Sequence, residues 1–104
     1  AMDRMHPLLA TKADGLHPAV LRLIAKTVDA AHQAGKWVGV CGELGSDPKA
    51  VPILVGLGVD ELSVNTAAIP LVKAQVRSLD YEQSKSLGQQ ALQCATAAEV
   101  RKLA

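Results

Sequence analysis

The sequence predicts an α/β fold with parallel strands, and three observations support this prediction. Stretches with the apolar spacing of amphipathic helices alternate with short apolar runs that suit buried strands. Glycine, proline and helix-capping residues stand at the boundaries between these stretches. The chain has 104 residues, of which 49% are hydrophobic and only 2% aromatic, so its core must be aliphatic. This length allows one small domain at most, or part of a larger one.

The first predicted helix is the clearest element. Residues 1–16 show no periodicity and are expected to form a loop. A helix should begin at Pro18 and stop at Gly35, because proline is favoured at the first helical position and glycine just after the last. Spacings of three and four residues predict its apolar face, which consists of Leu21, Ile24, Val28 and Ala31.

Two short strands are predicted on either side of a second helix. Residues 37–41, WVGVC, are apolar and bounded by a lysine and a glycine, which suits a buried parallel strand. Asp47 should cap a helix over 48–57, and Pro52 should delay its start or kink it. The second strand is expected over 60–64, DELSV.

Further helices follow the second strand. Asn65 or Thr66 can cap a helix over 67–79. The pairs Asp80 with Gln83 and Thr96 with Glu99 have the capping-box spacing and predict two more helix starts. Strands that alternate with helices indicate βαβ units. Two parallel strands leave both edges unpaired, so we expect part of a larger fold or a chain completed by another copy.

Charge and cysteine content exclude several classes of protein. The net charge is +1 and no basic stripe is present, which argues against nucleic-acid binding and a membrane-surface role. The apolar runs are too short to span a bilayer, and the first residues lack a signal peptide's apolar core. Cys41 and Cys94 suggest neither a disulfide framework nor a metal site. We therefore expect a cytoplasmic protein.

Candidate functional residues lie where the predicted strands end, because βαβ barrels place their functional groups in the loops that follow the strands. Cys41 and Glu43 follow the first strand, and Ser63 and Asn65 end the second. Each also has an ordinary interpretation: a packed cysteine, a surface carboxylate and two helix caps. Arg4 would by default be a solvated charge.

The remaining histidines and the second cysteine carry no functional pattern. His6, His17 and His32 share no metal-ligand spacing, so we expect them to be structural or exposed. Cys94 lies on the apolar side of a late helix and should pack in the core.

Four segments together resemble a known family: MDR at 2–4, HPAVLRLI at 17–24, GKWVGVCGELGSDPKA at 35–50 and LVGLGVDELSVN at 54–65. They are similar to Enzyme I of the bacterial phosphoenolpyruvate:sugar phosphotransferase system, and to the Enzyme I module of multiphosphoryl transfer proteins. The resemblance fades after about residue 80. Pyruvate phosphate dikinase and phosphoenolpyruvate synthase share the CGE turn and remain alternatives.

The resemblance implies a fold and a reaction. Residues 1–104 would form the C-terminal part, the last two strands and flanking helices, of a (β/α)8 TIM barrel that binds phosphoenolpyruvate. The whole enzyme would move the phosphoryl group of phosphoenolpyruvate to its own histidine and then to a phosphocarrier protein for sugar uptake. Cys41 would be the acid/base that protonates the pyruvate enolate, and Arg4 would bind the substrate. Glu43 would orient Cys41.

The resemblance also implies a cofactor and partners. Mg²⁺ would be held by carboxylates that precede residue 1, so no metal ligand is expected within 1–104. By itself the chain should be inactive and should form a homodimer through its uncovered edges. The alternative from another class is a non-catalytic barrel fragment that self-associates.

Overall fold

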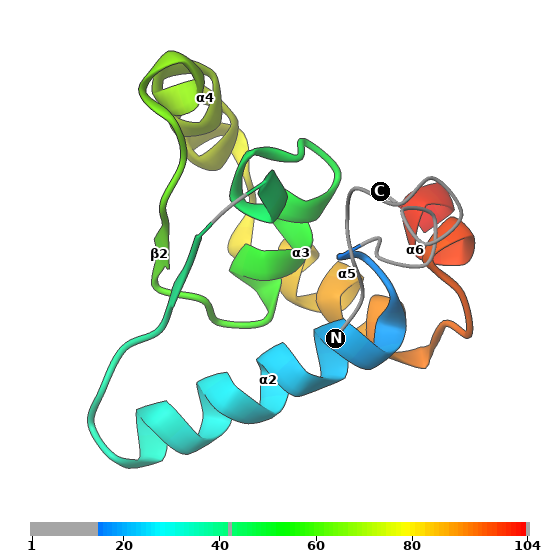
Figure 1. Ribbon diagram of the computed structural model, residues 1–104. Helices are drawn as coiled ribbons and strands as arrows, with labels where there is room; N and C mark the ends of the chain where they lie inside the picture. Colours follow the sequence, from blue (N-terminus) through cyan, green and yellow to red (C-terminus); the bar gives the residue numbers. More distant parts are fainter. Residues whose placement is uncertain (1–14, 42, 104) are drawn as a thin grey trace, which may run out of the picture.

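The computed structural model describes residues 15–41 and 43–103 (Figure 1). Its elements, in chain order, are α2 (Pro18–Gln33), β1 (Gly39–Val40), the 3-10 turn η1 (Glu43–Ser46), α3 (Ala50–Gly56), β2 (Glu61–Leu62), the 3-10 turn η2 (Thr66–Ala68), α4 (Ile69–Ser78), α5 (Tyr81–Gln93) and α6 (Ala97–Leu103).

The two strands are parallel neighbours joined by α3, as predicted. Gly39 lies opposite Glu61, and Val40 lies opposite Leu62. Each strand has two residues, so both are shorter than the five-residue segments predicted. Within 15–41 and 43–103 no third strand extends the ladder on either side. A strand with one partner forms few ladder hydrogen bonds, which accounts for the short length of both strands.

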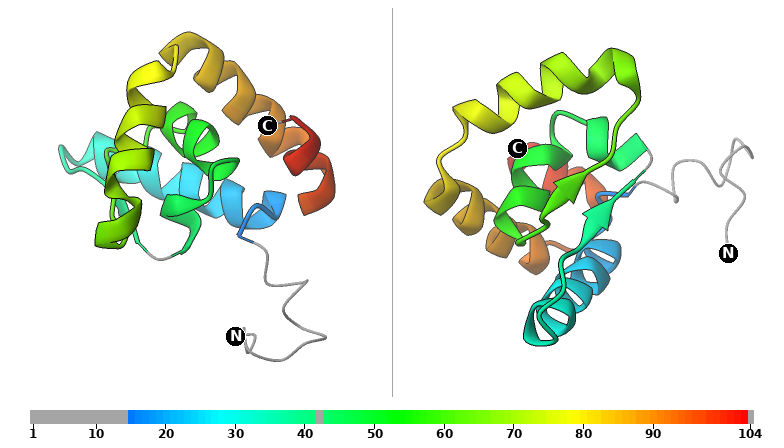
Figure 2. Two further views of the ribbon diagram at one scale, coloured as in Figure 1. Left: turned by 90° about the horizontal axis from the view of Figure 1, so that it is seen from above. Right: turned by 90° about the vertical axis from the view of Figure 1, so that its left-hand side faces the viewer.

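Helices cover one face of this sheet and leave the other open. The side view in Figure 2 shows β1 and β2 in front, with α3, α5 and α6 behind them. Val40 and Leu62 are partly buried and pack against the helical core. Gly39 and Glu61 are exposed. This is the alternation expected of strands with one covered face.

The core lies between α2, α3, α5 and α6. The fully buried Leu21, with Val28, confirms the predicted apolar face of α2. Leu16, at the end of the stretch predicted to be a loop, is also fully buried. The buried members of the core cluster are Leu16, Leu21, Ala50, Ile53, Leu54, Leu57, Ala91 and Val100.

The closest helix contact is between α3 and α5. A Cβ added at Gly56 would lie 1.8 Å from the carbonyl oxygen of Ser84. Gly88 faces the same crossing, where an added Cβ would lie 3.3 Å from Leu57 Cδ2. The two backbones approach this closely because neither glycine carries a side chain.

The predicted caps set most helix ends. Pro18 occupies the first turn of α2, and Gly35 ends it with φ 72°. Asp80 Oδ1 accepts from Glu82 N and Gln83 N at 2.9 and 3.2 Å. Thr96 Oγ1 accepts from Glu99 N at 3.2 Å. These contacts confirm the predicted starts of α5 and α6.

One helix has the late start that Pro52 predicted, and another predicted helix is divided in two. The helix expected over 48–57 begins at Ala50, so Pro52 falls in the first turn, where its missing N–H breaks no ladder bond. The stretch predicted as one helix over 67–79 divides into η2 and α4, and the predicted cap Asn65 serves η2.

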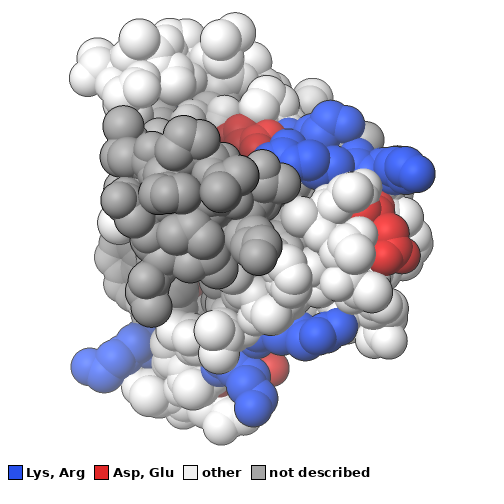
Figure 3. Space-filling model, turned by 45° about the vertical axis from the view of Figure 1, so that its right-hand side comes forward, with Lys and Arg blue, Asp and Glu red and all other residues white. Residues whose placement is uncertain are grey.

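The described residues form no extended field of one charge on the face in Figure 3. Lys and Arg side chains lie there in small groups beside acidic and uncharged residues. Among the described residues, no helix combines the length and the apolarity needed to cross a membrane.

Candidate functional site at the carboxyl ends of the strands

Cys41 directly follows β1 on the open side of the sheet. The thiol is free, and the residue is exposed. Strand alternation puts Cys41 on the same face as Gly39 and opposite to the covered Val40. The cysteine was expected either to pack in the core or to act at the strand end, and its exposure excludes the packed role within the described residues.

The turn after Cys41 lies directly on the ends of both strands. A Cβ added at Gly45 of η1 would lie 3.2 Å from the Ser63 carbonyl oxygen and 3.5 Å from the Val40 carbonyl oxygen. Gly45 is buried. The absence of a side chain at this position lets the loop close over the strand ends and holds it near Cys41.

Ser63 and Glu61 supply polar groups on the open face. The backbone N–H of Ser63 donates to the Val40 carbonyl at 2.8 Å, which continues the ladder past β2. The Ser63 hydroxyl donates to Glu61 Oε1 at 3.3 Å. Sequence reasoning read Ser63 as a helix cap, but the cap is Asn65, whose Oδ1 accepts from Ala68 N at 3.0 Å. The alternation of DELSV, with Glu61 and Ser63 on one face, is the signal that could have found the pair.

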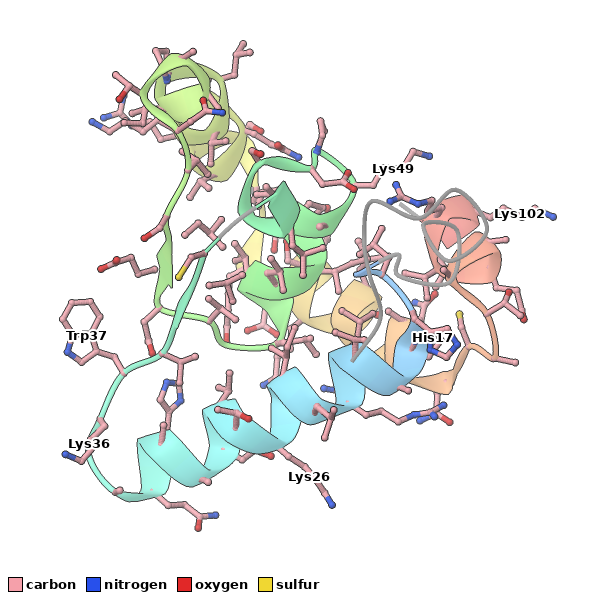
Figure 4. The ribbon with its side chains drawn as sticks, viewed as in Figure 1. His17, Lys26, Lys36, Trp37, Lys49 and Lys102 are labelled. Atoms are coloured by element: carbon pink, nitrogen blue, oxygen red, sulfur yellow. The ribbon has the colours of Figure 1, made fainter. Side chains whose placement is uncertain are left out.

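A second contact set ties the loop to the last helix. Asp47 Oδ1 accepts from Lys49 N at 3.0 Å, and Asp47 Oδ2 pairs with Arg101 at 3.0 Å. Lys49 Nζ donates to the Arg101 carbonyl at 3.1 Å. Asp47, predicted as a helix cap, therefore joins the start of α3 to α6. Lys49 and Lys102 are labelled in Figure 4 on neighbouring elements.

At the amino ends of the strands, the Asp60 side chain forms two hydrogen bonds to other elements. Asp60 Oδ2 lies 2.7 Å from His32 Nε2 and accepts from Val38 N at 2.8 Å. The hydrogen bond from His32, followed by that from the Val38 N–H, lowers the pKa of the Asp60 carboxyl. Trp37 in the same connection is 71% exposed and points away from the helices in Figure 4.

Of the remaining residues considered in the sequence analysis, some lie within the described part of the chain and some outside it. Arg4 and His6 lie outside the described residues, as does the side chain of Glu43, which begins η1. His17 is exposed, as expected, and its Nδ1 caps α2 by accepting from Ala19 N at 3.1 Å. Cys94 is partly buried against the core. The described residues contain no cluster of three metal-binding side chains.

Comparison with known proteins decides the family. Residues 1–81 match the model of the PEP-utilising enzyme, PEP-binding domain, where PEP is phosphoenolpyruvate. The chain belongs to this PEP-binding family. The family match includes both strands and the exposed cysteine between them.

Relatives of the chain carry the names that the resemblance predicted. It is 56% identical over 103 residues to the multiphosphoryl transfer protein of Rhodobacter capsulatus, covering 99% of this chain and 12% of that protein. It is 41% identical over 100 residues to the phosphoenolpyruvate-protein phosphotransferase of Staphylococcus carnosus, covering 96% and 18%. The Haemophilus influenzae protein of that name is 40% identical over 103 residues, covering 99% and 18%. The chain thus spans less than a fifth of each relative.

Proposed function

We propose that residues 1–104 form the last two strands and flanking helices of a (β/α)8 barrel in a phosphoenolpyruvate-protein phosphotransferase. The observation that supports this best is the exposed Cys41 at the carboxyl end of a parallel strand. Active sites of such barrels lie at that end. The open face of the sheet would then line the barrel's interior.

Two apolar grooves beside the sheet support the barrel interpretation. One has a volume of about 470 Å³ between β2, α3 and α4, and its walls include Val55, Leu62 and Val72. The other has a volume of about 240 Å³ between α2 and β1, where Leu23 and Val38 form part of the wall. In a closed barrel, neighbouring strands and helices would fill both grooves.

In the proposed reaction the phosphoryl group of phosphoenolpyruvate moves to a histidine elsewhere in the enzyme and then to a phosphocarrier protein. The pyruvate enolate that remains needs a proton at its methylene carbon. The S–H bond of Cys41 breaks as the new C–H bond forms, which leaves pyruvate and a thiolate. In the reverse direction the thiolate takes a methyl proton from pyruvate.

The other proposed roles rest on the family resemblance. The guanidinium of Arg4 would bind the phosphate or carboxylate of the substrate through two parallel hydrogen bonds. Glu43 would orient Cys41 through the loop that Gly45 packs on the strands. Mg²⁺ would neutralise charge on the substrate and would be held by carboxylates outside residues 1–104.

Exchange of the pyruvate methyl protons tests the role of Cys41. In the complete protein that carries this chain, Cys41→Ala should slow exchange with solvent deuterium by at least about 100-fold, the usual contribution of an acid/base group. Cys94→Ala removes the other thiol and should leave the rate unchanged. A Cys41→Ala protein that exchanges at the wild-type rate would remove Cys41 from its role. A wild-type protein that takes no phosphoryl group from phosphoenolpyruvate would contradict the proposed function itself.

A lysine variant tests Arg4. Arg4→Lys keeps the positive charge but loses the planar fork, so transition-state stabilisation should fall by about 1.5–3 kcal/mol. The measurement is kcat/KM for phosphoenolpyruvate in the complete protein. Unchanged kinetics would assign Arg4 a structural role.

The isolated chain should be an inactive homodimer. Both sheet edges are open within the described residues, and Leu23 and Leu71 are 66% and 77% exposed. Pairing with an identical copy is the simplest way to cover such surface. Analytical ultracentrifugation at micromolar concentration measures the mass. A stable monomer would show that these elements need no partner.

A further inference from the structure

A hydroxyl–carboxylate pair on the open face has no part in the reaction described so far. Glu61 and Ser63 are two residues apart, so their side chains leave the strand on the same side. The hydroxyl of Ser63 donates to Glu61 Oε1 at 3.3 Å, and both residues are exposed. Leu62 between them packs toward the helices.

The register of the sheet brings this pair beside Cys41. Val40 lies opposite Leu62, and Ser63 N donates to the Val40 carbonyl at 2.8 Å. Continued one residue past the ends of both strands, this register would set Cys41 opposite Ser63 on the open face, at the usual strand spacing of about 4.8 Å.

Glu61 reaches this position because its own cross-strand neighbour is a glycine. A Cβ added at Gly39 would lie 3.7 Å from both Glu61 Cβ and Glu61 Oε1. The carboxylate therefore lies over the strand below Cys41, and the hydroxyl of Ser63 lies between the carboxylate and the strand end. The three groups would form a row from the first residue of β2 to the carboxyl end of the sheet.

We propose that Ser63 and Glu61 are positioning residues that relay protons between Cys41 and water; this inference rests on the proposed function of Cys41. After Cys41 gives its proton to the enolate carbon, the O–H proton of Ser63 moves to the thiolate. As that bond breaks, the Glu61 carboxylate takes a proton from a hydronium ion of the solvent and passes it to the Ser63 oxygen, which leaves water and restores both groups. The reverse order carries a pyruvate methyl proton to water, so every proton is accounted for.

The relay would let protons reach the Cys41 sulfur while the substrate is bound. In the proposed complex, a pyruvate bound against the thiol would cover the side from which water reaches the sulfur directly. Ser63 approaches from the neighbouring strand and leaves the substrate side free. The hydroxyl donates to Glu61 at 3.3 Å, and in the proposed relay the Ser63 side chain rotates to turn its proton toward the sulfur.

Three variants of the relay residues and one control variant, all in the complete protein, test the relay by solvent deuterium exchange into the pyruvate methyl group. Ser63→Ala and Glu61→Gln should each slow exchange at least about tenfold, because the glutamine keeps an acceptor but cannot pass a proton on. Ser63→Thr keeps the hydroxyl and should stay within about threefold of wild type. Ser86→Ala, which removes an exposed hydroxyl on α5, should have no effect.

A second readout separates the relay from structural damage. The first transfer of a phosphoryl group from phosphoenolpyruvate needs no proton from Cys41, so its rate and the KM should be unchanged in all three variants. Wild-type exchange in Ser63→Ala or Glu61→Gln would overturn the relay. Equal losses of exchange and first-turnover phosphorylation would also overturn it, in favour of a structural role. A Cys41→Ala protein with normal exchange would instead defeat the proposed function on which the relay depends.

Discussion

The covered and open faces of the β1–β2 sheet differ in what their side chains contact. On the covered face, Val40 and Leu62 pack against a core that includes the close crossing of α3 and α5. On the open face, Cys41, Glu61 and Ser63 are exposed, and two of them bond to each other. The covered face contributes the packing of the core, and the open face carries a thiol, a carboxylate and a hydroxyl. Substitutions on the two faces should therefore have separable effects on stability and activity.

The largest effect on stability is expected at Gly56, on the covered side. Gly56→Ala would place a methyl group against the Ser84 carbonyl, so the helices must separate and the free energy of unfolding should fall by about 3 kcal/mol or more. Urea denaturation followed by circular dichroism measures the loss.

Gly35→Ala is the matched control for this prediction. Gly35 has φ 72°, but nothing lies within 4 Å of an added Cβ. The cost should be about 1–2 kcal/mol of backbone strain alone. Equal losses for the two variants would mean that α3 and α5 are not as close as described.

On the open side, the helix cap Asn65 should contribute more to stability than Cys41. Asn65→Ala removes the acceptor for Ala68 N and should cost about 1 kcal/mol in the same denaturation experiment. Cys41→Ala should change the free energy of unfolding by less than about 0.5 kcal/mol, since the side chain is exposed. A large loss of stability in Cys41→Ala would show that the open face also contributes to the stability of the fold.

The smallest effect is expected at the amino ends of the strands and depends on pH. The His32 and Val38 hydrogen bonds lower the folded-state pKa of Asp60 below its usual 3.8. The folded state therefore gains stability above about pH 4 and loses it as the pH falls through the lowered pKa. Asp60→Asn should be less stable than wild type near neutral pH, and the difference should shrink below about pH 4.

Urea midpoints measured from pH 7 down to pH 3 check this prediction. His32→Ala is the complementary variant, because it removes the first-named cause of the pKa shift while keeping the carboxyl. It should show a weaker acid dependence than wild type. A midpoint difference between Asp60→Asn and wild type that stays constant with pH would show that the carboxyl's titration contributes nothing.

Sequence alone predicted the features that depend on local chemistry. The proline at position 18, the glycine at 35 and the side-chain caps at 80 and 96 fix helix ends through contacts within a few residues. The parallel strand pair followed from the order of elements. The family resemblance was confirmed by the match over residues 1–81.

What the sequence missed depends on contacts between distant residues. Leu16 stands alone in a stretch without periodicity, so its burial is set by helices that follow it in the chain. The strand lengths depend on how many neighbours each strand has. The Glu61–Ser63 pair was overlooked because Ser63 was judged as a helix cap and not by the face of the strand from which it projects.

The contact between Asp47 and Arg101 has a consequence for protein engineering. At the far end of the loop after Cys41, Asp47 Oδ2 accepts a hydrogen bond at 3.0 Å from Arg101, which lies 54 positions after Asp47 in the chain. Lys49 donates a second hydrogen bond to the carbonyl of the same arginine. A loop graft of residues 41–49 onto another scaffold would leave this anchor behind. The transplanted turn would need its own substitute for α6, so the portable unit is the loop together with its distant helix.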